Sequence, residues 1–268
     1  MSSLEPATVS ISLEELGRRG GLTGPHKDGW GVAFYAGRDV RIVRETCPAS
    51  SSSSIEFIKS QNFRSRIVIS HIRQATKGAV ELSNTQPFAR EVGGRMHVFA
   101  HNGDLEGIEE RMAAGEGPYR ALGDTDSEYA YCVLMNRMYT LWSSAQAPDL
   151  QARLALVSRF ALELRDLGPA NFVYSDSEVL YVHGHQRTQQ ETGEIGPPGL
   201  YTLCRTCPSR APRQHIEGVE IGLPEGRQQR VLLAASVPLT QEAWTPLAEG
   251  EVLAIAGGRV LKSERLAA

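Results

Sequence analysis

The sequence has no apolar run long enough to cross a membrane and no strong excess of charge of either sign. None of its hydrophobic stretches approaches the roughly 20 residues that a transmembrane helix needs. The first residues lack the basic and then apolar pattern of a secretory signal peptide. The formal net charge is −3, so nothing favours nucleic acid or an anionic membrane as a partner. We therefore expect a cytoplasmic protein that binds neither nucleic acid nor membranes.

Cysteine is scarce. The four cysteines, Cys47, Cys132, Cys204 and Cys207, do not form the framework of a small secreted protein, which predicts reduced thiols. Cys204 and Cys207 have two-residue spacing but no second pair, so we expect no metal site, and no cofactor is indicated. Cys132 is predicted to lie in the core. Cys47 is the only cysteine with a predicted exposed position, and no neighbour there would make its thiol reactive.

Hydrophobic residues make up 41% of the 268 positions, which is enough for a sizeable core. No linker divides the chain convincingly, so residues 1–268 are predicted to form one domain. Strands, two adjacent long helices and further strands indicate a layered α/β arrangement. The patterning predicts helices near residues 12–20, 55–58, 125–141 and 150–164, and strands at residues 30–35, 40–43, 67–69, 96–100, 171–174, 179–183, 200–204, 231–235, 252–255 and 259–261. The serine run Ser50–Ser54 is predicted to be a flexible surface loop, and residues 184–199 a polar loop of unassigned role.

Arg73 follows the apolar strand that ends near His71. A guanidinium in that place can take a carboxylate through two parallel hydrogen bonds, which a lysine cannot match. An ordinary surface salt bridge is the alternative, and for Arg73 alone it is the better one. Thr76 and Gly78 strengthen the binding interpretation slightly, because both suit a tight turn that faces a ligand.

His101, Asn102 and Gly103 follow the second apolar strand. The Asn102 amide and the Gly103 N–H are the parts of an oxyanion hole, in which one donor can be worth about 10²–10³ in rate. The alternative is a turn, because Asn-Gly is the commonest hairpin turn pair, and taken alone the turn is the favoured interpretation. Both interpretations stay open, since a turn also exposes the N–H.

Asp126 lies where a helix should begin. A carboxylate there stabilises the helix through its dipole, and this could be its whole role. The functional alternative is that Asp126 receives an ammonium group, with Asp124 as a competitor for either role. The run from Gly24 to Gly31 is also dense in special residues: His26 and Asp28 could bind or polarise a ligand, whereas Trp30 is predicted to be core.

These motifs, taken in order, resemble a class II glutamine amidotransferase domain, and more narrowly its stand-alone, single-domain branch. The resemblance rests on Gly24 to Gly31, His71 to Gly78, Asn84 to Phe88, His101 to Gly103 and Thr125 to Glu128, and it extends to about Leu261. Each motif is modest by itself, whereas five in the same order are specific.

The resemblance implies the N-terminal-nucleophile hydrolase fold, an α+β four-layer αββα sandwich with two mainly antiparallel sheets between helices. It implies hydrolysis of the glutamine side-chain amide to glutamate and ammonia through a γ-glutamyl thioester. Arg73 would hold the α-carboxylate and Asp126 the α-ammonium of glutamine, with Thr76 and His101 beside the substrate. Asn102 and Gly103 would form the oxyanion hole.

Two positions depart from the family pattern. Gln86 stands where relatives often have histidine, and Ser2 stands where the family nucleophile, a cysteine after the initiator methionine, is expected. The α-amine of that cysteine would serve as general base, since a terminal amine titrates near pH 8. We expect that the printed start is late and that Met1 matches an internal methionine of relatives. Ser2 as a substitute nucleophile is disfavoured, because no strand is predicted to place it in the site. An inactive scaffold is the third possibility.

The sequence thus predicts an amidotransferase-type glutaminase whose ammonia acceptor would be a separate synthase, and the chain as printed should be inactive. A hydrolase of γ-glutamyl amides or peptides is the alternative enzyme. A catalytically inactive amino-acid-binding module on the same fold is the non-enzymatic alternative. The oligomeric state is not predicted.

Overall fold

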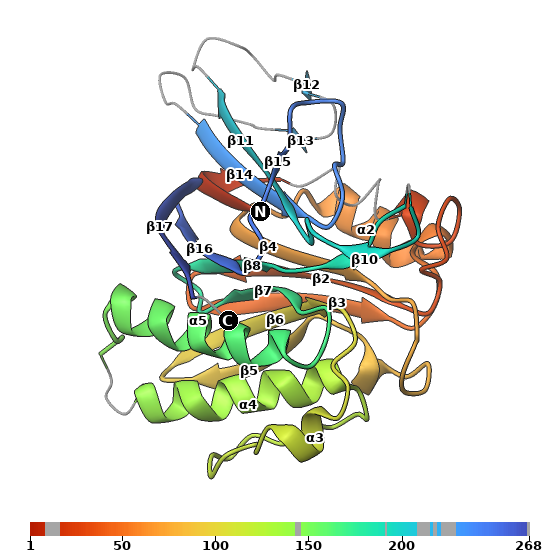
Figure 1. Cartoon of the computed structure of the whole chain (residues 1–268). Helices are drawn as coiled ribbons and strands as arrows, with labels where there is room; N and C mark the ends of the chain where they lie inside the picture. The colour runs from red at the N-terminus through yellow and green to blue at the C-terminus, as the bar shows by residue number, and fades with distance from the viewer. Residues whose placement is uncertain are drawn as a thin grey trace.

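Two mainly antiparallel sheets lie face to face between layers of helices in the computed structural model of the chain (Figure 1). The structure describes residues 1–8, 17–142, 146–190, 192–207, 215–216, 219–220 and 229–266. One outer layer is helix α2 (Ser53–Gln61), and the other is the pair α4 (Asp126–Leu141) and α5 (Leu150–Arg165). The predicted αββα sandwich is confirmed.

The larger sheet has seven strands. Strand β1, which the sequence did not predict, lies at its centre. Its order is β15 (Thr245–Pro246), β11 (Tyr201–Cys207), β14 (Gln229–Ala235), β1 (Ser2–Ala7), β4 (Ser65–Ile72), β2 (Trp30–Ala36) and β3 (Asp39–Glu45). The β1 strand is antiparallel to β4, with Ser2 opposite Ile67. The sequence of β1 is polar and lacks the regular apolar spacing of a strand, so the sequence did not predict it. The strand forms because its partners on both sides satisfy its backbone N–H and C=O groups.

The second sheet has six strands and carries the long helices on its outer face (Figure 1). Its order is β17 (Arg259–Arg265), β16 (Glu251–Ala256), β8 (Leu180–Gly184), β7 (Asn171–Ser175), β6 (Arg95–Asn102) and β5 (Phe88–Val92). Shorter elements are η1 (Ala49–Ser51), η2 (Leu82–Asn84), α3 (Ile108–Arg111), β9 (Arg187–Thr188), β10 (Ile195–Gly196), β12 (His215–Ile216) and β13 (Val219–Glu220).

Three apolar clusters fill the spaces between the layers. The largest packs α4 and α5 against the six-stranded sheet, around Phe99 and Phe160. A second cluster lies between the two sheets and contains Ile69 and Val182. The third packs α2 against the seven-stranded sheet and contains Trp30, which is fully buried as predicted. Burial of a large apolar side chain contributes about 1.5–3 kcal/mol, so these layers hold the strand ends in fixed places.

Helix α4 begins as predicted, and of the two hydrogen bonds of a capping box, which the spacing of Thr125 and Glu128 would allow, only one forms. The Thr125 side chain accepts a hydrogen bond from the Glu128 N–H at 3.3 Å. The Glu128 carboxylate turns instead to the N–H groups of Leu122 and Gly123 and to the guanidinium of Arg90. Glu128 thereby holds the segment before the helix, whereas in a capping box it would accept only from the N–H of the N-cap residue.

The serine run is not a flexible loop, which corrects the prediction. Ser52 is the N-cap of α2 and accepts from the Ser54 N–H at 3.2 Å. The hydroxyls of Ser52 and Ser54 donate to the carboxylate of Glu45. Serine is favoured at caps because its short side chain reaches free backbone N–H groups, so low complexity here encodes a helix start. Of the helix predicted near residues 12–20, residues 17–19 are helical in the structure. Residues 12–16, which include Ser12 and Glu15, lie outside the described residues.

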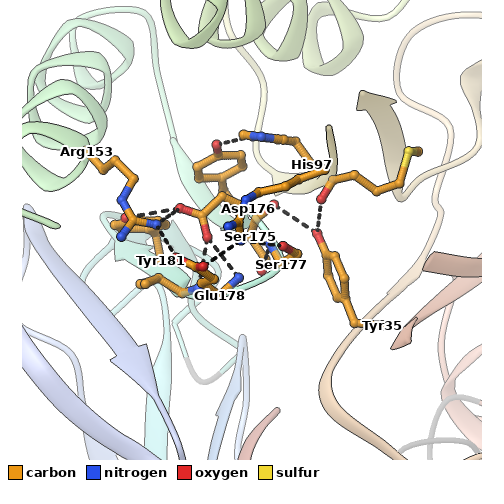
Figure 2. Close-up of polar contacts among 12 residues, drawn as sticks. Tyr35, His97, Arg153, Ser175, Asp176, Ser177, Glu178 and Tyr181 are labelled. Carbon is orange, nitrogen blue, oxygen red and sulfur yellow. Dashed lines mark hydrogen bonds and ion pairs between the residues drawn. The ribbon is translucent and has the colours of Figure 1, made fainter. Parts of the chain in front are cut away.

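A buried polar cluster closes the β7–β8 turn at the end of the sheet where β7 finishes (Figure 2). Asp176 has no exposed surface and accepts from Arg153 of α5 at 2.8 Å. Its other oxygen accepts from the N–H groups of Glu178 and Val179 at 3.0 and 2.9 Å. The Tyr35 hydroxyl, from the other sheet, donates to the carbonyl of Ser175 at 2.9 Å. This cluster joins both sheets and one helix.

Candidate functional site

The ends of β4 and β6 and the start of α4 meet at one place. The carboxylate of Asp126, the first residue of α4, accepts from the N–H of Leu105 in the segment after β6, at 2.7 Å. Lys77, in the loop after β4, places its ammonium 4.0 Å from the same carboxylate. Three of the predicted motifs, far apart in the sequence, therefore form a single cluster.

Arg73 immediately follows β4 and is 4% exposed. Its Nη1 donates to the carbonyl of Ala79 at 3.0 Å, and its Nη2 donates to the carbonyls of Lys77 and Gly78 at 2.9 and 3.1 Å. Gly78 has φ +73°, and a Cβ there would press on Asp124 and Asn84. The guanidinium is thus held by a tight loop and is not a freely moving surface cation.

The Asp126 carboxylate is also held in place. Its Oδ1 accepts from the backbone N–H of Ser127 at 2.7 Å, and its Oδ2 from Leu105 as described above. The side chain is 11% exposed. Because backbone N–H groups on two elements hold it, the Asp126 carboxylate has a fixed position at the start of α4.

Lys77 contacts both Arg73 and Asp126, through different atoms. Its carbonyl oxygen accepts from the Arg73 guanidinium, while its ammonium pairs with Asp104 at 2.5 Å and approaches Asp126. The pKa of Lys77 is raised, chiefly by the hydrogen bond to Asp104, so the ammonium stays charged. Through its carbonyl and its ammonium, Lys77 thus connects the loop that holds Arg73 with the start of α4.

His101 and Gln86 brace the end of β6. Gln86 accepts from the His101 N–H at 2.6 Å and donates to the His101 carbonyl at 3.1 Å, as a neighbouring strand would. The His101 ring lies 2.9 Å from Ser127 Oγ and 3.3 Å from the Pro169 carbonyl. Burial lowers the pKa of His101, so the ring is neutral and joins β6 to the first turn of α4.

Asn102 is the last residue of β6, and its side chain is exposed. Gly103 packs against the carbonyl of Pro169 so closely that a Cβ would overlap it. The chain then runs on to α3 and α4 and does not return as a neighbouring strand. The alternative that Asn102 and Gly103 form a two-residue hairpin turn is therefore wrong.

The Gly24–Gly31 run lies beside Arg73. Asp28 accepts from the Ala75 N–H at 2.8 Å, and its own N–H donates to the Arg73 carbonyl at 3.0 Å. Burial lowers the pKa of His26, and burial together with nearby positive groups lowers the pKa of His71 to about 3. Asp28 therefore holds the loop after Arg73, and both histidines are neutral near pH 7.

Other candidate residues have different surroundings. Thr76 is exposed, and Asp124 is held by Asn84, whose amide contacts its carboxylate at 2.5 Å. Asp124 is thus engaged in holding the wall of the cluster, which leaves Asp126 as the better placed of the two acids.

The cysteines partly correct the predictions. Cys132 is buried as predicted, and burial raises its pKa to about 11. Cys204 is exposed on β11, whereas Cys47 is only half-buried, so Cys47 is not the one exposed cysteine. Burial and the adjacent Glu45 raise the pKa of Cys47. Within the described part of the chain no group of three or more His, Cys, Asp or Glu side chains could hold a metal ion, and no helix there is long and apolar enough to cross a membrane.

Ser2 lies on strand β1. The absence of a strand, which was the reason for disfavouring Ser2 as a nucleophile, is therefore wrong. Its hydroxyl accepts from the Gly258 N–H at 3.3 Å, and it is fully buried. Its partner Ile67 precedes Arg73 by six residues along β4. At about 3.3 Å per residue, Ser2 therefore lies roughly 20 Å along the sheet from Arg73, too far to attack a bound ligand there.

Asn171 links the site to the segment predicted as a loop at residues 184–199, which contains the short strands β9 and β10. Its amide donates to the carbonyls of Asn102 and Gln186 at 3.0 and 2.6 Å, and it accepts from the His185 N–H at 2.8 Å. The base of this segment thus lies against the end of β6.

Sequence reasoning assigned no role to Lys77, Asp104 or Ser127. Lys77 stands inside a motif already singled out, so a charged side chain at a ligand-facing turn was the available signal. Asp104 and Ser127 each adjoin a predicted site residue, but nothing in their spacing indicated that they would contact Lys77 and His101.

Comparison with known proteins gives consistent matches. The model of the family described as "Glutamine amidotransferases class-II" matches residues 1–267. The Escherichia coli protein named "Putative glutamine amidotransferase YafJ" is 33% identical over 254 residues, which cover 94% of this chain and 93% of that protein.

Solved structures agree in fold. A glutamine amidotransferase of Pseudomonas aeruginosa, so named by prediction, has a TM-score of 0.66 and 32% identity, over 97% of this chain and 95% of that one. The Bacillus subtilis glutamine phosphoribosylpyrophosphate amidotransferase has a TM-score of 0.57 and 15% identity, over 98% of this chain and 48% of that one. At that identity the second likeness concerns the fold alone.

Proposed function

Because the chain belongs to the class-II glutamine amidotransferases, we propose that its site binds glutamine and releases the side-chain amide as ammonia through a γ-glutamyl thioester. The ammonia acceptor would be a separate synthase. The observation that carries the proposal is that one residue, Lys77, contacts Arg73 with its carbonyl and approaches Asp126 with its ammonium, which supports a site shared by the two.

The two charged groups suit the head group of an amino acid. A guanidinium has five N–H groups, and three hydrogen bonds hold Arg73 to its loop, so further donors are available to an α-carboxylate. Asp126 would take the α-ammonium. Thr76 and His101 would flank this space from the loop after β4 and from the end of β6. Asp28 and His26 would support it from the side of Arg73, where Asp28 holds the Ala75 N–H.

The end of β6 suits the reacting amide. In the thioester step a thiolate attacks the side-chain carbonyl carbon, the C–N bond breaks, and the nitrogen leaves as ammonia after taking a proton. The negative charge that forms on the carbonyl oxygen would be met by the Asn102 side chain and the Gly103 N–H. Water then cleaves the thioester to glutamate. Close packing of Gly103 against Pro169 supports a fixed donor at this position.

The nucleophile would be a cysteine on a strand that continues β1 ahead of Met1. Because Ser2 lies opposite Ile67, each residue added before Met1 would lie opposite the next residue of β4, and such a strand would arrive beside Arg73. The α-amine of that cysteine would act as general base, with a pKa near 8 in its unperturbed state. The chain as printed would bind glutamine without hydrolysing it.

The test compares the printed chain with a version extended by Met-Cys and a short apolar segment. We expect calorimetry to detect L-glutamine binding to both and glutamate release only from the extended version. Arg73→Lys in the extended version should lower glutamine affinity by at least tenfold, because one point charge replaces a bidentate contact. Release from γ-glutamyl peptides but not from glutamine would identify a γ-glutamyl hydrolase. Binding without release from either would indicate an inactive binding module.

A further inference from the structure

Lys77 presents to the site the same pattern of charge as the head group of an amino acid. Its carbonyl oxygen accepts from Nη2 of Arg73 at 2.9 Å. Its ammonium lies 4.0 Å from Oδ2 of Asp126. An acceptor oxygen on the guanidinium and a positive nitrogen near the carboxylate stand where an α-carboxylate and an α-ammonium would make their contacts.

Resting on the proposed function, we propose that Lys77 is a built-in competitor for the ammonium position and thereby determines which ligands this site prefers. The ammonium of Lys77 must withdraw from Asp126 before an amino acid binds fully. Asp104, which pairs with Lys77 at 2.5 Å, is the counter-ion that receives it.

The surroundings of Asp126 make the competition direct. Oδ1 accepts from both the N–H and the hydroxyl of Ser127, whereas Oδ2 accepts from one N–H, that of Leu105. A ligand ammonium must therefore approach Oδ2 from the open side, where Lys77 lies. Two ammonium groups beside one carboxylate repel each other, and solvent around the 43% exposed Lys77 side chain reduces this repulsion without removing it.

Lys77 and Asp104 are free enough to move. Their side chains are 43% and 54% exposed, so rotation of the lysine stem disturbs no packed core. The Lys77 carbonyl stays on Arg73 while the side chain turns, since backbone and side chain are held by different partners. The position of the Lys77 side chain thus determines how far the charge of Asp126 is neutralised before a ligand binds.

A ligand without an α-ammonium avoids this competition. Glutaramate, which is glutamine lacking its α-amine, would keep its carboxylate contact with Arg73 and would not need Asp126. Lys77 therefore narrows the difference in affinity between amino acids and their deaminated analogues, and removing its charge should widen that difference.

The test is calorimetric titration of the printed chain and of Lys77→Gln, Asp104→Asn and the double variant with L-glutamine and with glutaramate. We expect Lys77→Gln to bind L-glutamine about threefold to tenfold more tightly and glutaramate no more tightly. Asp104→Asn should bind L-glutamine about twofold to fivefold more weakly, because Lys77 then has only Asp126 as partner. In the double variant the effect of Asp104→Asn should vanish.

The outcomes separate the two proposals. If the unchanged chain binds L-glutamine and Lys77→Gln binds it equally or more weakly, the competitor role of Lys77 is refuted and the proposed function stands. If the unchanged chain and all three variants fail to bind L-glutamine at millimolar concentration, the proposed function is refuted together with it. Both substitutions change exposed side chains, so circular dichroism should show an unaltered fold in every variant.

Discussion

Replacing Asp176 by asparagine tests whether the buried cluster of Figure 2 stabilises the fold through its charge. Asp176 is fully buried, and Arg153, its partner at 2.8 Å, is 7% exposed. In Asp176→Asn the amide oxygen can still accept from Glu178 and Val179, whereas the guanidinium loses its buried counter-ion. Breaking a buried pair on one side costs about 3–5 kcal/mol. Glu178 remains 3.3 Å from Arg153, which favours the lower end of that range.

We therefore expect Asp176→Asn to lose about 3 kcal/mol of unfolding free energy in urea denaturation, with an unchanged m-value. Glu178→Gln is the matched control: its side chain is 44% exposed, so its loss should stay below about 1 kcal/mol. Adding Arg153→Met to Asp176→Asn should restore part of the stability, because the unpaired cation is removed. A loss below 1 kcal/mol for Asp176→Asn, or no recovery in the double variant, would refute the role of the charge.

Two further predictions concern the histidines and the end of β6. Burial lowers the pKa values of His71 and His183 to about 3 and that of His97 to about 4, so the unfolded chain binds more protons below pH 6.5 and stability falls as the pH drops towards 4. Each histidine can contribute up to about 1.4 kcal/mol of unfolding free energy per pH unit in this window. His97→Gln should therefore reduce the slope of unfolding free energy against pH, measured by urea unfolding at several pH values. A constant unfolding free energy between pH 6.5 and 4.5 in the unchanged chain would contradict the prediction. Gly103→Ala should cost about 1–3 kcal/mol of stability, because its Cβ would overlap the Pro169 carbonyl. The resulting shift of the strand end should also abolish glutamate release in the extended chain; retained release would show that the close packing of Gly103 on Pro169 is not needed to position an oxyanion donor.

The regular parts of the fold were predictable because their residues follow simple periods. The helices that became α4 and α5, the β7–β8 hairpin and the strands β6 and β16 appear where apolar spacing predicts them. The strand β1 and the edge strand β5 were missed, since their stability comes from neighbours distant in sequence and their own patterns are mixed. The serine run was misread because cap chemistry outweighs composition.

For the candidate site, the sequence supplied the residues but not their contacts. The predicted residues Arg73, Asp126, His101 and Asn102 lie at element ends that converge, and their roles in binding and catalysis stay predictions. Lys77, Asp104 and Gln86 act through pairings set by tertiary geometry, which spacing along one chain does not encode.

The single amide of Asn171 ties the strand end that carries Asn102 to the foot of the β9–β10 hairpin. Among the described residues of this segment, the contacts with Asn171 lie at its root, at His185 and Gln186, so we expect changes in residues 187–190 and 192–197 to leave the end of β6 in place. An engineer who wants a new recognition arm on this scaffold should graft it there and leave Asn171 unaltered.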